Sequence, residues 1–165
     1  MVDAEHQSSA RRRRHPLASV PTLVAALLLG ILSPAAGAEK PRLLPPGDPD
    51  RRAVLDELRP ALSLSMRGPV EFRVSFVKTL QGWAHARVTP QRPGGAPIDI
   101  AETIYAEDAG MMDGLLTDAL FRRQGERWYL IVHVVGPTDA ASSNWTTGGC
   151  PYDLLIDRGV EETER

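Results

Sequence analysis

Residues 70–89 read VEFRVSFVKTLQGWAHARVT. Apolar and polar side chains alternate over residues 70–79, and small or apolar side chains alternate with larger polar ones over residues 83–89. Alternation with a period of two is typical of a strand with one buried face. Gln81 and Gly82 lie between the two runs and mark a tight turn. This stretch therefore predicts an antiparallel β-hairpin.

The length of the turn determines which side chains of the hairpin share a face. A two-residue turn at 81–82 pairs Phe76 with Arg87, which sets an apolar side chain opposite a charged one. A three-residue loop at 80–82 pairs Phe76 with Ala86 and keeps the apolar residues together. The sequence therefore favours the three-residue loop.

An amphipathic helix is expected before the hairpin. Asp48 is a preferred N-cap residue and Pro49 suits the first helical position. Apolar residues then recur in steps of three and four, at Val54, Leu55, Leu58, Leu62 and Met66. Pro60 lies inside this stripe, so we expect it to kink or split the helix. The stripe should cover the apolar hairpin face, which comprises Phe72, Val74, Phe76, Ala86 and Val88.

Two further strands are expected after the hairpin, at residues 115–123 and 127–135. The second is apolar on both faces, which is typical of a central strand. Residues 98–114 predict only a turn or a short strand, and residues 138–165 predict a loop-like tail. The fold class expected is α+β, with one N-terminal helix packed on an antiparallel sheet of at least four strands.

The N-terminus has the pattern of a secretory signal peptide. Arg11–Arg14 is a cationic run, Val20–Leu32 is mostly apolar, and Ala36-Gly37-Ala38 is a small-x-small site. The apolar run is too short for a typical transmembrane helix. We therefore expect export to the periplasm or secretion, with no stable membrane span after cleavage. The expected segments are a signal peptide (1–38), a flexible leader (39–47), a single α+β domain (48–155) and a disordered acidic tail (156–165).

The charge and cysteine content narrow the possible partners. Removal of residues 1–38 leaves 15 basic and 19 acidic residues, with no dense basic block. Binding to nucleic acid is not expected, because it requires a clustered cationic surface. Cys150 is the only cysteine, so the chain has no internal disulfide. A thiol that is buried or lies in the tail is favoured over a reactive one.

Five short motifs stand out along the chain: Leu58–Ala61, Gly68–Phe72, Gly82–Ala84, Thr89–Gly95 and Gly136–Asp139. Together they resemble a family of short exported bacterial proteins that has no assigned activity, and the resemblance covers roughly residues 50–155. The layout is also similar to the cystatin-like and NTF2-like superfamily. That similarity implies a fold and carries over no catalytic residues.

His85 and His133 are the only histidines after the predicted signal peptide. Together with Asp99, Asp113 or Asp139 they are candidates for a metal site or a general-base pair. Their spacing matches no recognised ligand pattern, so we predict no metal and no cofactor.

The expected ligand site lies on the half-polar face of the sheet. Trp83, His85 and Arg87 share that face, and Tyr129 and His133 are expected nearby from the last strand. Aromatic area with a few polar groups is typical of ligand sites. The favoured function is a non-catalytic periplasmic module that binds an envelope protein or a small ligand. The alternative is a small NTF2-like hydrolase or isomerase with a histidine base in a pocket between sheet and helix.

Overall fold

The computed structural model describes residues 39–112, 114–136 and 143–156, which all lie within one compact unit. The predicted signal peptide, Asp113, Asp139 and residues 157–165 of the predicted acidic tail lie outside the described residues. In chain order the elements are β1 (Arg42–Leu43), α1 (Pro49–Ser65), β2 (Glu71–Leu80), β3 (Trp83–Gln91), η1 (Ile100–Glu102), η2 (Ala106–Met111), β4 (Thr117–Gln124), β5 (Arg127–Val135), η3 (Ser143–Gly148) and α2 (Tyr152–Leu155).

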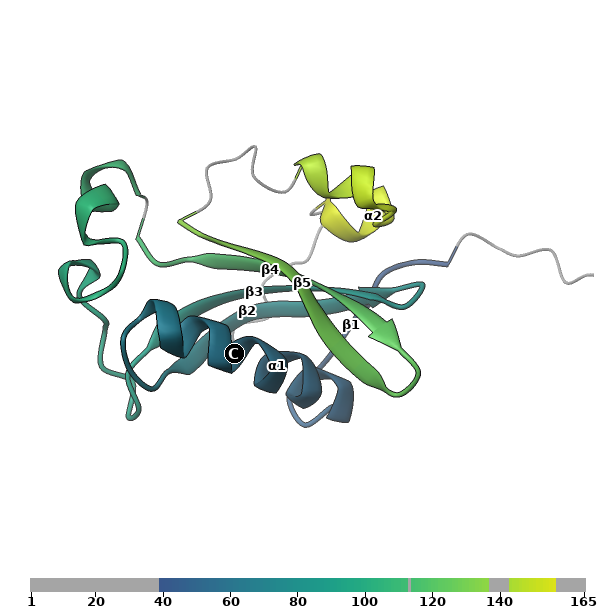
Figure 1. The fold of residues 1–165 in the computed structure, drawn as a ribbon. Coiled ribbons are helices and arrows are strands. Elements are labelled where there is room, and N and C mark those ends of the chain that lie inside the picture. The colour runs from purple at the N-terminus through teal and green to yellow at the C-terminus, as the bar shows by residue number, and fades with distance from the viewer. Residues whose placement is uncertain (1–38, 113, 137–142, 157–165) are drawn as a thin grey trace, which may run out of the picture. The chain divides into compact units, whose positions relative to one another are not determined.

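The five strands form one sheet in the order β1-β2-β3-β4-β5, with every neighbouring pair antiparallel. Helix α1 packs on one face, and α2 lies on the opposite face (Figure 1). We call these the helix face and the tail face. This arrangement confirms the predicted α+β fold, with one helix on an antiparallel sheet of at least four strands.

Helix α1 begins as the sequence predicts. The Asp48 side chain caps it by accepting a hydrogen bond of 2.9 Å from the backbone N–H of Asp50. The helix runs unbroken through Pro60, so the expected split does not occur. Its predicted stripe forms the main core with the helix face, where Val54, Leu58, Leu62 and Met66 are fully buried.

The predicted register of the hairpin is wrong near its turn. Leu80 pairs with Trp83, so the turn has two residues, Gln81 and Gly82, both with positive φ. Two positive φ angles are typical of the turn whose twist matches a two-residue hairpin. Phe76 consequently pairs with Arg87, the arrangement that the sequence disfavoured.

A β-bulge makes the two-residue turn compatible with an apolar core. The register shifts between Val74 and Phe76, and Val74 still pairs with Val88. An extra residue in one strand reverses the alternation of its side chains. Val77, rather than Phe76, therefore joins the core under α1, while Phe76 is buried on the tail face.

Three other segments can be compared with expectation, and two of them, the leader and β5, differ from it. The predicted flexible leader supplies β1, and Leu44 is fully buried in the main core. Residues 98–114, where a turn or a short strand was expected, contain the two 3₁₀ turns η1 and η2 and no strand among those described, so the turn alternative is the one found. The strand predicted to be central, β5, is the last strand of the sheet.

The C-terminal segment is not a loose tail over its described part. Leu80, Leu120, Trp145, Cys150 and Leu154 form a second buried cluster on the tail face. The chain thus has three layers, with the sheet between α1 and the segment that contains η3 and α2. The sequence did not reveal this layer, because η3 and α2 are too short to show a helical pattern.

Candidate functional site

A group of buried polar side chains lies between the tail face and the C-terminal segment. Asp118 on β4 is 2 % exposed and accepts a hydrogen bond of 2.9 Å from His85 Nε2 on β3. Arg87 completes the group with bonds of 2.9 Å from Nε and 3.1 Å from Nη2 to the two carboxylate oxygens. Strand pairing explains the arrangement, since Asp118 is paired with Arg87 in adjacent strands.

The electrostatics of this group keep Asp118 ionised. Burial alone raises the pKa of a carboxyl group, because it penalises the charged form. Hydrogen bonds and charge from His85 and Arg87 outweigh burial here, and they lower the pKa of Asp118. The carboxylate therefore remains an acceptor for both neighbours at neutral pH.

The C-terminal segment closes over the same group. His85 Nδ1 lies 3.4 Å from the carbonyl oxygen of Leu154, and Lys78 Nζ donates a bond of 3.2 Å to that of Ile156. The edge of the His85 ring also contacts Phe76 and Trp145, with ring centroids 5.0 and 5.7 Å apart. Polar strand residues thus hold the segment against the sheet.

The sequence placed His85 on a half-polar strand face as part of a ligand site, whereas the structure buries its side chain. Its exposed fraction is 1 %, and its two ring nitrogens face Asp118 and Leu154. A general base must reach the proton that it removes with an available nitrogen. In this arrangement His85 offers none, and its contacts are those of a structural residue.

The five predicted site residues do not converge. Trp83, His85, Arg87 and Tyr129 lie on the tail face, whereas His133 pairs with Ala119 of the main core and so lies on the helix face. Partial burial lowers the pKa of His133. The register of β4 with β5 shifts between Leu120 and Phe121. This β-bulge reverses the alternation of side chains in β5, so Tyr129 and His133 lie on opposite faces of the sheet. The sequence could not show that bulge.

Trp83 and Tyr129 are the partly exposed aromatic residues of the predicted site. Two arginines that the sequence did not single out lie beside them. The Arg122 guanidinium lies 4.9 Å from the ring centroid of Trp83, and that of Arg127 lies 5.3 Å from that of Tyr129. Arg122 pairs with both Trp83 and Tyr129 in the neighbouring strands. We call these four residues the aromatic–arginine patch. One signal in the sequence could have indicated Arg122. Asp118, Leu120 and Arg122 alternate along β4 and therefore lie on the same face.

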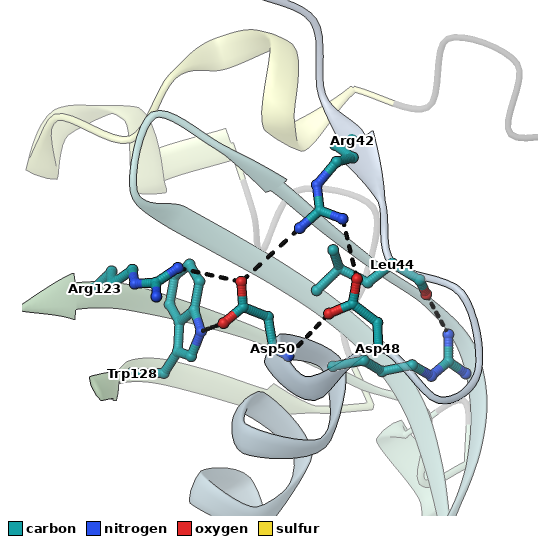
Figure 2. Close-up of polar contacts among 7 residues, drawn as sticks. Arg42, Leu44, Asp48, Asp50, Arg123 and Trp128 are labelled. Atoms are coloured by element: carbon teal, nitrogen blue, oxygen red, sulfur yellow. Dashed lines mark hydrogen bonds and ion pairs between the residues drawn. The ribbon is translucent and has the colours of Figure 1, made fainter. Parts of the chain in front are cut away.

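A separate charged network surrounds the start of α1, and Figure 2 shows its side chains. Asp50 accepts bonds of 3.1 Å from Arg123 Nη1 and from Trp128 Nε1, and Arg42 Nη1 donates a bond of 3.0 Å to Asp48. These contacts join β1, α1 and the β4–β5 hairpin. The role of the network is therefore to hold these elements of the fold together.

An open hollow of about 270 Å³ lies beside this network. It is lined by Pro46, Gly47, Asp48, Arg51, Arg52, Leu55, Asp56 and Arg59.

The remaining candidates show structural roles. Burial raises the pKa of the Cys150 thiol to about 11, which makes it a poor nucleophile at neutral pH. Asp99 caps η1 by accepting a bond of 2.9 Å from Ala101 N.

Among the residues described, no three His, Cys, Asp or Glu side chains are grouped to hold a metal ion. Likewise, no helix within residues 39–112, 114–136 and 143–156 has the length and apolar character to cross a membrane.

Comparison of the chain with models of protein families, with curated proteins and with solved structures finds no match. The family resemblance drawn from the short motifs therefore remains a prediction.

Proposed function

We propose that this chain is a non-catalytic binding module of the bacterial cell envelope, exported by its N-terminal segment, and that it holds an acidic polypeptide segment on the aromatic–arginine patch. The single observation that carries the proposal is the stacking of two guanidinium groups on two partly exposed aromatic rings, which lie on β3 and β5 on either side of β4. It is supported by the lack of an available nitrogen on His85, which disfavours His85 as the base of the hydrolase or isomerase alternative.

The chemistry of the patch suits carboxylate ligands. A guanidinium group that lies on an aromatic ring keeps its planar set of donors oriented, and that set matches a carboxylate in a bidentate geometry. Arg122 is further held by a bond of 2.8 Å from Nη1 to the backbone oxygen of Gln81. Trp83 and Tyr129 add apolar area, which favours a peptide over a free ion.

Binding of labelled oligoglutamate and oligolysine peptides to the purified protein tests this proposal. We expect saturable binding of oligoglutamate only. Arg122→Ala and Trp83→Ala should each weaken it at least about tenfold, since a hydrogen bond to a charged group contributes about 1.5–3 kcal/mol. Arg52→Ala, which removes an exposed arginine of α1, is the matched control and should bind as the wild type does. Equal binding of both peptides, or unchanged binding by the patch variants, would refute the proposal.

A further inference from the structure

The two edges of the sheet differ sharply in how they are protected. On one side, β1 has only two residues, and Pro41, Arg42, Pro45 and Pro46 lie in or beside it. Short edge strands, charges and prolines are the usual means by which proteins prevent further strand pairing. β1 pairs with only Lys78 and Thr79 of β2, and the charges of Glu71 and Arg73 lie on the part of β2 beyond it, so this edge is poorly suited to pairing with another chain.

The opposite edge has few such protections, because Arg127 at one end is its only charged residue and a β-bulge at Ile131 is its only irregularity. Strand β5 has nine residues, and Trp128–Val135 contains no proline and no Asp, Glu, Lys or Arg. Within the residues described, no strand pairs with its outer side. A strand of this length extends for about 30 Å and presents unpaired backbone donors and acceptors along that side.

The side chains of β5 are also more exposed than its composition predicts. Trp128 is the only buried side chain of this strand, and Ile131 is 52 % exposed. The register places Ile131 at a β-bulge, where it has no partner in β4. A bulge turns a side chain away from the regular alternation. The middle of the edge thus carries an exposed apolar residue.

We propose that the outer edge of β5 is the interface between two copies of this chain, which pair antiparallel about a two-fold axis near Ile131. The single charged residue of the strand, Arg127, lies at one end. Antiparallel pairing sets Arg127 near Val135 of the second copy and keeps the two arginines about 27 Å apart. Parallel pairing brings them together, and like charges in opposed positions destabilise a sheet.

A second copy fits this edge better than a foreign strand of unknown composition. The edge requires a partner strand that is long, uncharged and apolar, and β5 meets that requirement itself. A two-fold axis also brings the same surface of each copy together, which is the usual geometry of a homodimer. This inference is independent of the proposed acidic ligand.

Light scattering during size-exclusion chromatography of the purified protein at about 100 µM tests the proposal. We expect a dimer for the wild type and a monomer for Ile131→Lys, with an unchanged circular dichroism spectrum. Leu43→Lys is the matched control, because Leu43 is an aliphatic residue of similar exposure, 49 %, on the opposite edge. That variant should remain dimeric.

Cross-linking gives a second readout that does not depend on the folding of the lysine variant. Cα atoms of opposed residues in antiparallel strands are about 4.5–5.5 Å apart, within the range that a disulfide spans. Ile131→Cys in a Cys150→Ser background should therefore form a disulfide-linked dimer on mild oxidation, and Leu43→Cys in the same background should not. A monomeric wild type overturns the proposal. A dimer that survives Ile131→Lys, or equal cross-linking of both cysteine variants, also overturns it.

Discussion

Replacement of Asp118 by alanine is the most informative single perturbation of the interior. The Asp118 carboxylate accepts hydrogen bonds from His85 and Arg87 at 2.9–3.1 Å while it is 2 % exposed. Its removal leaves both donors without their acceptor. We therefore expect the free energy of unfolding to fall.

The magnitude follows from the exposure of the two donors. A buried donor left without a partner costs about 1–3 kcal/mol, and His85 is fully in that position. The Arg87 side chain is 31 % exposed, so water can replace part of its lost bonds. Removal of one partner from a buried ion pair costs about 3–5 kcal/mol. The lower end, about 3 kcal/mol, is expected here.

Urea unfolding followed by tryptophan fluorescence measures this loss. A decrease of about 3 kcal/mol lowers the midpoint by about 1.5 M if the slope is about 2 kcal/mol per M. Asp56→Ala is the matched control, because it removes an aspartate whose side chain is 58 % exposed. Its effect should stay below about 0.5 kcal/mol.

The effect should also depend on pH with a definite sign. The pKa of Asp118 is lowered on folding, so its stabilising contribution is present above the unfolded value of 3.8 and is lost as the pH falls through the lower folded value. The difference between wild type and Asp118→Ala should therefore be full at pH 7 and shrink below about pH 4. A loss under about 1 kcal/mol at pH 7, or a difference that grows in acid, contradicts this account of the buried group.

Three further outcomes are expected. Cys150→Ser should destabilise the protein by about 1–3 kcal/mol in thermal unfolding, because a hydroxyl replaces a thiol that is 4 % exposed in an apolar cluster; a neutral change would place the thiol outside that cluster. Gln81→Asn should stabilise it by about 0.5–1 kcal/mol in urea, since Asn-Gly suits a turn with two positive φ angles; a loss of stability would count against this turn geometry. Mass spectrometry of the exported protein should find Glu39 as its first residue, and full-length chain confined to the cytoplasm would exclude cleavage after Ala38.

The elements of the main core could be predicted because their signals are local. The stripe from Val54 to Met66 marks one side of α1, and Asp48 marks its start. Both patterns depend on residues a few positions apart, and backbone periodicity alone turns them into an amphipathic helix. The same reasoning found the hairpin and its two strands.

The register of the strands could not be predicted in the same way. The bulge after Val74 costs one unpaired residue, and it is favoured only because it buries Val77 under α1 and Phe76 on the other face. The three-residue loop was favoured from the sequence on the assumption that only one face of the sheet is covered. The C-terminal segment covers part of the other face, which makes a buried Phe76 there favourable.

The candidate site shows the same division. Trp83 was singled out from the sequence because an aromatic residue on a half-polar strand face is visible in the alternation, and Tyr129 because it lies in the last predicted strand. Their partners Arg122 and Arg127 were not found, and neither was the burial of His85 by Leu154, a residue 69 positions away. Composition and periodicity determined the helix, the strands and the predicted export of this chain. Contacts between distant segments decided which polar residues became interior and which stayed exposed, because burial depends on what packs above a residue and not on its neighbours in sequence.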